Sequence, residues 1–463
     1  MKNLRDTDTP CFRRVGVSDT KIKAQARFLM ADHVSPSQHF GPDYSLLPTI
    51  ESFGEHMSVP TGFDRSKREM LAEVLSYQYK GLPNQPDFSV LLRENTFVVA
   101  AFDGLNIFTG TLSFIYKIIT TIRLAHALQA AYPECQFVPL FVMDSESDDF
   151  RAIASFNAFG HTFRWQDAHQ GPVGSIDPAS LRRILNQLPA GPLLFAKSYL
   201  ENSCISNAVR AYMHELFGHY GLITLDPDNA MLKAGFSKTG QHGMEGLLSA
   251  NRPPSTDVNL NLFFSASILP VRAVVGDVTQ FRFWLEQKKL FDQLHMPFPT
   301  LVPRNQALIV KPAHLEKLQK FNVTWETFFE QNFCERIWYD GGDKKKSTSF
   351  SEEKKLTNQA FDAISDHVGH FGADVMQVLE LYRSDFANSL RLLERRIHQA
   401  EQRRWASRNE QLTTLKNKLF PNGVDQERFA NLLDFYWKDP HFIQKLYNTF
   451  DPLDFRYNVL LDE

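Results

Sequence analysis

Acidic residues crowd a short stretch that directly follows an apolar run. The run at 137–143 reads FVPLFVM, and the next residues include Asp144, Glu146, Asp148 and Asp149. Carboxylate oxygens bind ammonium groups and Mg²⁺, and a carboxylate of suitable pKa can transfer protons. Four carboxylates within six residues are also typical of a solvated loop. A cation-binding site and a surface loop are therefore both open interpretations.

Polar residues also follow a second apolar run, TFVVAA at 96–101. They are Asp103, Gly104, Asn106, Thr109, Gly110 and Lys117. A threonine and a glycine just before a helix can offer backbone N–H groups to an anion, and a lysine can bind phosphate or carboxylate. An Asp-Gly pair more often forms only a turn, and a helical lysine more often faces water. We expect a ligand site here, with those two structural roles as the alternatives.

The spacing between the two apolar runs predicts how these residues meet. Both runs have the composition of buried strands, and the segment 110–130 between them has a helical pattern. A strand, a helix and a strand of these lengths predict a βαβ unit with parallel strands. Neighbouring parallel strands end at the same edge of a sheet, so the loops near Thr109 and Glu146 should surround one small-molecule pocket.

The same alternation continues along the chain. Further strands are predicted at 155–165, 221–225, 258–264, 271–275 and 301–310, and helices at 64–79, 178–188, 203–219 and 280–294. This order predicts an α/β fold with a doubly wound parallel core and helical insertions. We expect a mostly helical N-terminal segment at 1–90, the core at 91–340, and a C-terminal segment at 425–463 that packs back on the core.

A charged helical segment at 350–424 carries an apolar repeat. The repeat consists of Val375, Leu379, Tyr382, Phe386, Leu390, Leu393, Ile397 and Ala400. Its steps of three and four residues predict a coiled-coil arm. A helix cannot cover its own apolar stripe, so we expect a partner helix, either 351–368 of the same chain or a second subunit. A long helix that lies on the core is the alternative.

Bulk composition argues against several classes of protein. The formal net charge is −3, whereas a non-specific nucleic-acid binder needs a basic surface. No apolar run is long enough to span a membrane, and the polar N-terminus lacks a signal core. The four cysteines are scattered, which argues against structural zinc and is typical of a reduced protein. We expect a cytoplasmic protein with no nucleic-acid or membrane partner and no metal site.

Three stretches and the C-terminal tail together resemble one known family. They are IFTGTLSFIYKIITTIRLA at 107–125, FVPLFVMDSESDDFRAIASFNAFG at 137–160, LKNKLFPNGVDQERFANLLDFY at 415–436 and FDPLDFRYNVL at 450–460. In this order the chain resembles the cysteine-adding enzymes of bacillithiol biosynthesis. The resemblance implies a Rossmann-like core with a coiled-coil arm used in homodimerisation. It also implies a reaction that joins L-cysteine to the amine of glucosaminyl-malate as an amide.

The resemblance also implies site residues. Positions that match the family pattern are Thr109, Gly110, Lys117, Glu146, Asp149, Asn157, Gly276, Arg304 and Asn305. Three histidines of the family are replaced here, by Asp103, Asp148 and Ser155. We therefore take Asp103, Asp148 and Asp149 as the catalytic candidates. We assign substrate or cofactor binding to Asn106 and to the remaining matched positions.

These replacements change the chemistry that the site can perform. A histidine with a pKa of about 6.5 exchanges protons near pH 7, whereas an aspartate with a pKa of about 3.9 stays ionised. A glycine-rich turn of the family also becomes Gly276, Asp277 and Val278 here, and the side chains of Asp277 and Val278 would obstruct or repel a phosphate. The copy looks divergent and shortened, because little chain separates the segments 258–264 and 271–275, where the family has an insertion.

Two functional hypotheses follow from the resemblance. The first is a cysteine ligase, and the second is a catalytically degenerate paralogue that serves as a binding or assembly module. A free carboxylate does not acylate an amine at neutral pH, so a ligase must activate cysteine. Adenylation by ATP with Mg²⁺ is the natural route on a Rossmann-like fold, although the resemblance leaves the cofactor open.

Overall fold

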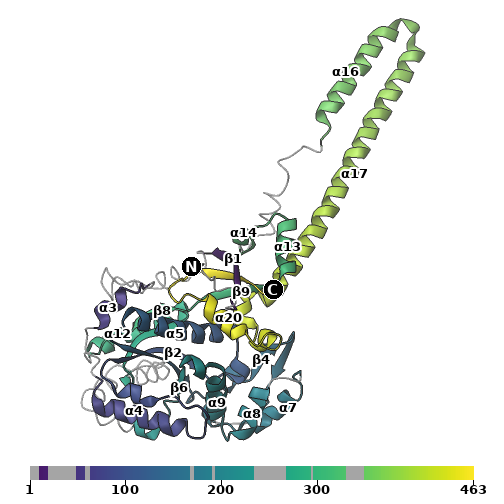
Figure 1. Cartoon of the computed structure of the whole chain (residues 1–463). Coiled ribbons are helices and arrows are strands. Elements are labelled where there is room, and N and C mark those ends of the chain that lie inside the picture. The colour runs from purple at the N-terminus through teal and green to yellow at the C-terminus, as the bar shows by residue number, and fades with distance from the viewer. Residues whose placement is uncertain are drawn as a thin grey trace, which may run out of the picture. The chain divides into compact units, whose positions relative to one another are not determined.

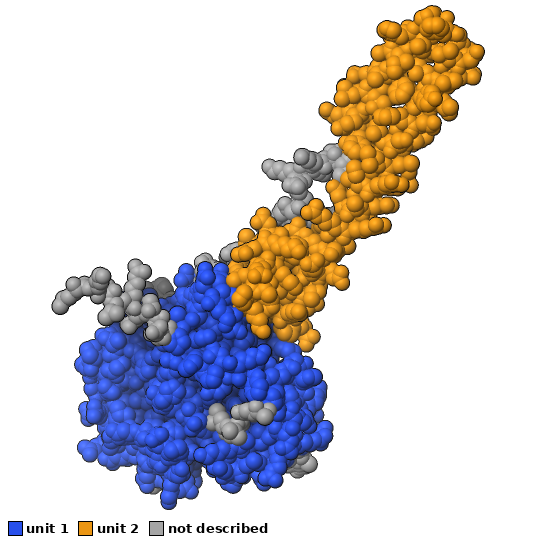
Figure 2. Space-filling view, turned by 45° about the vertical axis from the view of Figure 1, so that its right-hand side comes forward, with its two compact units in different colours: residues 1–309, 424–463 blue, residues 310–423 orange. Residues whose placement is uncertain are grey.

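The chain folds into two compact units (Figure 2). Unit 1 contains residues 1–309 and 424–463, and unit 2 contains residues 310–423. The computed structural model describes residues 10–18, 48–57, 63–166, 171–189, 193–233, 267–293, 296–329 and 349–463.

A five-stranded parallel sheet forms the centre of unit 1 (Figure 1). Its order is β6 (Ile223–Leu225), β3 (Gln136–Asp144), β2 (Thr96–Gly104), β7 (Val271–Gly276) and β8 (Thr300–Pro303). The chain runs outward from β2 through β3 to β6, and then continues on the other side of β2 as β7 and β8. The strand order therefore reverses between β2 and β7, where doubly wound sheets bind their ligands. The predicted doubly wound α/β core is confirmed.

Helices cover both faces of this sheet, as its apolar strands require. α5 (Leu112–Ala131) joins β2 to β3, and its Leu124 and Leu128 share a core with Val99 of β2. α4 (Arg65–Gln78) and α12 (Phe281–Gln293) share a second core with Val98. Successive strand residues point to opposite faces, so burial on both sides explains the continuous apolar run of β2.

Shorter elements complete unit 1. A second sheet has the order β1 (Arg13–Ser18), β10 (Tyr457–Leu461) and β9 (Gln306–Val310). Within the described residues the other α-helices are α3 (Ser52–Met57), α6 (Phe150–Ile153), α7 (Arg182–Leu185), α8 (Leu193–Glu201), α9 (Ile205–Phe217), α18 (Gln426–Phe429), α19 (Leu433–Tyr436) and α20 (Phe442–Thr449). The helices predicted at 64–79, 203–219 and 280–294 correspond to α4, α9 and α12. The segment predicted as a helix at 178–188 holds a 3₁₀ turn followed by α7.

Two of the predicted strands are wrong in their extent. The run 301–310 forms β8 and β9, which belong to different sheets. The chain leaves the parallel sheet at Asn305, whose backbone N–H donates to Thr120 Oγ1 at 3.0 Å. The run 155–165 is an antiparallel hairpin of β4 (Ser155–Ala158) and β5 (His161–Arg164), because Phe159 and Gly160 turn the chain with positive φ angles. The predicted strand 258–264 lies outside the described residues.

Unit 2 contains an antiparallel pair of long helices, α16 (Ser351–Val368) and α17 (Ala373–Leu419), together with α13 (Pro312–Lys320) and α14 (Trp325–Phe329). Lys354 Nζ lies 2.6 Å from Glu394 Oε2, and Arg383 contacts Asp362 nearer the other end of the pair. The partner helix for the apolar repeat of α17 therefore comes from the same chain. No helix among the described residues is long and apolar enough to cross a membrane.

The apolar repeat of α17 is only partly covered by α16. Leu390 and Ile397 are half-buried in the pair. A second set remains open, with exposed fractions of 40% at Val375, 63% at Tyr382 and 47% at Leu393. Their spacing of seven and eleven residues places these three side chains on one side of the helix. We call these three side chains the uncovered stripe, because the α16–α17 hairpin alone leaves them exposed to water.

Candidate active site

The candidate site lies where β2 and β3 end. The two strands pair in parallel register, with Asp103 opposite Met143 and Gly104 opposite Asp144. The connections that carry Thr109 and Glu146 therefore leave the sheet side by side. The sequence-based expectation that these two loops begin at one edge of the sheet is confirmed.

Lys117 is buried in this region and pairs with Asp103. Its Nζ lies 2.6 Å from Asp103 Oδ2 and 3.0 Å from Gln280 Oε1, and the residue is 1% exposed. Asp103 belongs to the end of β2, and Lys117 belongs to the buried face of α5. The alternatives of an isolated Asp-Gly turn and of a lysine in water are therefore wrong. The ion pair fixes the end of β2 against α5.

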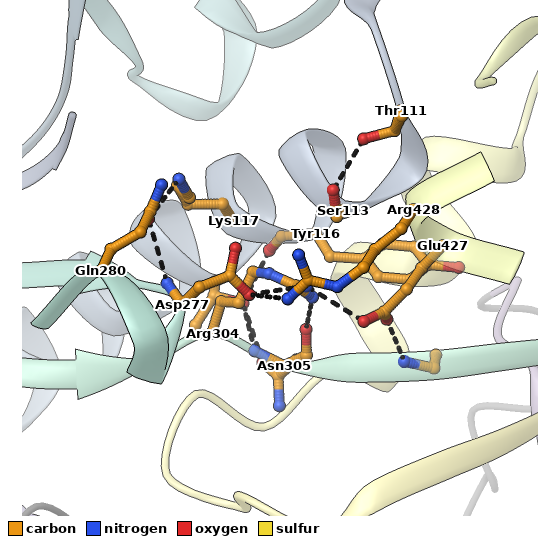
Figure 3. A network of polar contacts seen from close by, with 12 residues as sticks. Thr111, Ser113, Tyr116, Lys117, Asp277, Gln280, Arg304, Asn305, Glu427 and Arg428 are labelled. Atoms are coloured by element: carbon orange, nitrogen blue, oxygen red, sulfur yellow. Dashed lines mark hydrogen bonds and ion pairs between the residues drawn. The ribbon is translucent and has the colours of Figure 1, made fainter. Parts of the chain in front are cut away.

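A second charged group surrounds Asp277, just after β7 (Figure 3). Its Oδ1 lies 2.8 Å from Arg304 and 3.3 Å from Arg428, and its backbone N–H donates to Gln280 Oε1 at 3.2 Å. Burial alone would raise the pKa of Asp277, but Arg304, Lys117 and Arg428 hold that pKa below the ordinary value. Asp277 is therefore an ionised partner of two arginines.

The carboxylates after β3 divide into two groups. In the first, Asp144 stands at the strand end, where surrounding protein and the charges of Glu146, Asp103 and Asp226 raise the pKa of its carboxyl group. Ser145 donates a hydrogen bond to Asp226, and Glu146 forms an ion pair with Lys233. We call this group of carboxylates the negative region. Asp103, Glu146 and Asp226 each have a cationic partner, in Lys117, Lys233 and Arg210, but their charges still raise the pKa of Asp144. Such a group suits an ammonium group or a proton.

The second group, Asp148 and Asp149, lies exposed on the loop that follows. Asp149 Oδ1 accepts hydrogen bonds from the backbone N–H groups of Arg151 at 3.1 Å and Ala152 at 3.3 Å, and so caps α6. Asp148 is exposed. The surface-loop interpretation therefore describes these two residues well, whereas Asp144 and Glu146 have specific neighbours.

The turn between β2 and α5 has an unusual backbone. Phe108, Thr109 and Gly110 have φ angles of 49°, 66° and 60°. A left-handed conformation costs a non-glycine residue about 1–2 kcal/mol, and a Cβ on Gly110 would overlap the Asn106 side chain. The backbone N–H of Gly110 donates to Ile107 O at 3.0 Å, and that of Leu112 donates to Ala430 O at 2.8 Å. The expectation that Gly110 offers its N–H to an anion is therefore wrong.

Four other residues predicted to bind ligands contact the protein itself. Arg304 is 1% exposed and pairs with Glu427 at 3.0 Å. Asn305 Nδ2 donates to Asp451 O at 2.7 Å, and Asn157 Nδ2 donates to Phe429 O at 3.5 Å. Gly276 ends β7, where a Cβ would lie 3.1 Å from the ring of Phe281. These contacts are typical of residues that position loops.

Metal-ligating side chains are not grouped at this edge of the sheet. Within the described ranges, no three or more His, Cys, Asp or Glu residues are arranged to hold a metal ion. Two of the carboxylates near the end of β3 have other partners instead. Glu146 forms an ion pair with Lys233, and Asp226 accepts a hydrogen bond from Ser145. The chemistry available from the described side chains is therefore cation binding and proton transfer.

Comparisons with known proteins agree with this architecture. Residues 17–252 match the family model described as bacillithiol biosynthesis BshC, N-terminal Rossmann-like domain, and residues 307–461 match its C-terminal coiled-coil domain. Proteins named "Putative cysteine ligase BshC" from Flavobacterium psychrophilum and Flavobacterium johnsoniae are 26% and 25% identical to the chain. The two alignments cover 93% of this chain and 96% and 97% of those proteins.

A relative of the same name from Cytophaga hutchinsonii is 24% identical over 96% of this chain and 98% of its own length. The first family model covers β2, β3 and β6 of the parallel sheet, and the second covers the long helices α16 and α17. The chain thus belongs to the BshC family of bacillithiol biosynthesis, with a Rossmann-like domain followed by a coiled-coil domain.

Proposed function

We propose that this protein joins the carboxyl group of L-cysteine to the amine of glucosaminyl-malate, forming an amide. The family supports a ligase, since its members are named as cysteine ligases. The observation that carries the proposal is the placement of Asp144 near Glu146, Asp103 and Asp226 at the end of β3, beside the end of β2. This negative region suits the ammonium group of cysteine and the proton that the reaction releases.

Amide formation releases a proton that needs an acceptor. The amine nitrogen attacks the activated cysteinyl carbon, the new C–N bond forms, and the activating group departs with its electron pair. The nitrogen then carries one proton too many, and a carboxylate of raised pKa is a better acceptor than an ordinary one near pH 7. Asp144 has this property, so we assign it as the proton acceptor in place of Asp148 or Asp149.

Activation of cysteine needs an energy source, and ATP with Mg²⁺ remains the proposed one. The β2–α5 turn does not fit the phosphates of a nucleotide, because the N–H groups of Gly110 and Leu112 bond inside the protein. Asp277 adds a negative charge near the end of β7. These residues supply no cradle for a phosphate, and no step of the reaction is assigned through the nucleotide.

The second candidate function is a catalytically degenerate paralogue. This function is favoured because two of the catalytic candidates make structural contacts. Asp103 pairs with Lys117, and Asp149 caps α6. The histidines that the family resemblance implies are absent at Asp103, Asp148 and Ser155. In this role the negative region would bind an amino compound without turning it over.

The test of function is a product assay. Purified protein is mixed with cysteine and glucosaminyl-malate, with and without ATP and Mg²⁺, and the mass of the amide product is followed. We expect product, formed more slowly than by a relative that retains the three histidines. No product over many hours, together with calorimetric binding of cysteine, would favour the paralogue.

The uncovered stripe on α17 predicts a homodimer. Val375, Tyr382 and Leu393 repeat along one side of the helix, and a second copy offers the same surface to cover them. Leu393→Glu is expected to weaken dimerisation by about tenfold or more, because covering an unpaired carboxylate costs more than about 1.4 kcal/mol. Sedimentation velocity over a range of protein concentrations measures the change.

The neighbouring residue supplies the matched control. Leu392 is 57% exposed but points to a different side of α17. Leu392→Glu should leave the sedimentation coefficient of the wild type unchanged. A wild-type protein that stays monomeric at micromolar concentration, or equal effects of the two substitutions, would contradict dimerisation through this stripe.

A further inference from the structure

One short segment contacts four connections around the candidate site. We call residues 426–434 the strap; this segment follows unit 2 in the sequence and belongs to unit 1. Around β8 and β9, Gln426 contacts Ile309 N at 2.8 Å and Glu427 contacts Arg304 at 3.0 Å, and just after β7, Arg428 contacts Asp277 at 3.3 Å. In the β4–β5 hairpin, Phe429 O contacts Asn157 at 3.5 Å and Asp434 contacts Phe159 N at 2.6 Å. Between β2 and α5, Ala430 O contacts Leu112 N and Asn431 contacts Phe108 O, both at 2.8 Å. The strap thus joins connections that are far apart in the sequence.

Asn431 is the residue of the strap that holds the left-handed turn. Its Nδ2 donates to Phe108 O at 2.8 Å and also to Gly110 O. Its own position is fixed, because Oδ1 accepts from Leu433 N at 2.8 Å and its backbone N–H donates to Asp434 at 3.1 Å. Asn431 is 1% exposed, so water does not compete for these bonds.

We propose that Asn431 is a positioning residue for the candidate active site. It holds the β2–α5 turn in its left-handed form through the carbonyls of Phe108 and Gly110. The kinetic part of this inference rests on the proposed ligase function, whereas the conformational part does not. Asn431 lies more than three hundred residues after the turn in the sequence, so the site is completed by the C-terminal end of the chain.

The turn matters because it joins two charged groups of the site. Asp103 precedes it on β2, and Lys117 follows it on α5. If the turn relaxes toward ordinary φ angles, the start of α5 shifts and the Lys117–Asp103 pair loses its geometry. A displacement of about 1 Å in a reacting arrangement can lower a rate by about 10²-fold. Binding of cysteine beside Asp144 depends on β3, and the contacts of the strap described above go to other connections, so KM for cysteine should change little.

The experiment compares two buried asparagines. Asn458 is 0% exposed and also donates from Nδ2 to two backbone carbonyls, Gln306 O at 3.2 Å and Arg456 O at 3.1 Å. It lies on β10 in the second sheet. Asn431→Asp and Asn458→Asp each remove two donors and place a carboxylate against two carbonyl oxygens. They should therefore destabilise the protein to a similar extent.

The readouts separate positioning from stability. Hydrogen exchange followed by mass spectrometry should show backbone amides in peptides covering 106–114 exchanging at least about tenfold faster in Asn431→Asp only. The kcat of that variant should fall by about 10²-fold, with KM for cysteine within about threefold of the wild type. Asn458→Asp should retain the kcat of the wild type.

Each failure has a distinct meaning. Equal exchange at 106–114 in the two variants would overturn the role of Asn431, even if both proteins make product. Faster exchange in Asn431→Asp combined with an unchanged kcat would also overturn it. If the wild type makes no product, the ligase proposal fails, and the exchange experiment still decides whether Asn431 holds the turn.

Discussion

Asp144→Asn is expected to lower the rate of amide formation by roughly 10²- to 10⁴-fold, the usual contribution of a positioned proton acceptor. Asparagine has nearly the same shape as aspartate but cannot accept the proton from the attacking amine. The product-mass assay under single-turnover conditions measures the effect. Asp148→Asn is the matched control on the same loop, because both residues are exposed and Asp148 has no assigned neighbour in the site. A larger loss of rate in Asp148→Asn than in Asp144→Asn would instead favour Asp148, the catalytic candidate predicted from the sequence.

The pH dependence provides an independent check on Asp144. Surrounding protein, then Glu146 and Asp103, raise the pKa of this carboxyl group, so the rate should fall with decreasing pH at values above the ordinary aspartate pKa of about 3.9. This limb should disappear in Asp144→Asn. A raised pKa also means that the folded state binds the proton more tightly than the unfolded state does, so the ionised group opposes folding at neutral pH. Asp144→Asn should therefore not lower the free energy of unfolding, and a large loss of stability would contradict this assignment.

Glu427→Gln is expected to lower the free energy of unfolding of unit 1 by about 3 kcal/mol. Glu427 and Arg304 are each 1% exposed, and their ion pair measures 3.0 Å. The second carboxylate oxygen of Glu427 accepts from Ala307 N at 3.0 Å. Glutamine removes the charge, and Asp277, 2.8 Å away, is then the carboxylate that still pairs with the guanidinium of Arg304. Denaturant unfolding followed by tryptophan fluorescence measures the loss.

An exposed ion pair supplies the comparison for Glu427. Arg282 and Glu286 pair at 3.2 Å on the surface of α12, with both side chains well exposed. Such a pair contributes about 0.3–0.5 kcal/mol, so Glu286→Gln should hardly change the unfolding midpoint. A shift of the unfolding midpoint in Glu427→Gln that is no larger than the shift in Glu286→Gln would contradict a stabilising role of the buried ion pair.

The central part of the fold follows directly from local sequence patterns. The runs at 96–101 and 137–143 are apolar because both faces of β2 and β3 are covered, and the helix between them makes their parallel pairing obligatory. Local sequence patterns did not reveal that the run 301–310 divides into two strands of different sheets. Every residue of β8 and β9 is buried, so hydrophobicity does not mark the point where the chain changes sheets.

The candidate site was only partly predictable. Asp103, Lys117 and Glu146 were found because they follow strands or match a family pattern, and strand ends indicate ligand sites in this fold. The importance of Asp144 depends on three-dimensional neighbours such as Asp226, which no local pattern brings together. The contacts of Glu427 and Asn431 join residues far apart in sequence, so they are visible only in the folded chain.

The split of unit 1 into two stretches has a consequence for how the protein is made. A ribosome synthesises the parallel sheet first, then all of unit 2, and only afterwards residues 424–463. At a rate of about 5–20 residues per second, a nascent chain spends on the order of ten seconds with Asp277 already made and Asn431 still absent. During that interval Arg304 has no Glu427, and β1 has no β10 to pair with. The emerging polypeptide therefore gains the contacts of Glu427 and Asn431 only after unit 2 has been made, and termination before residue 427 yields a chain that lacks both.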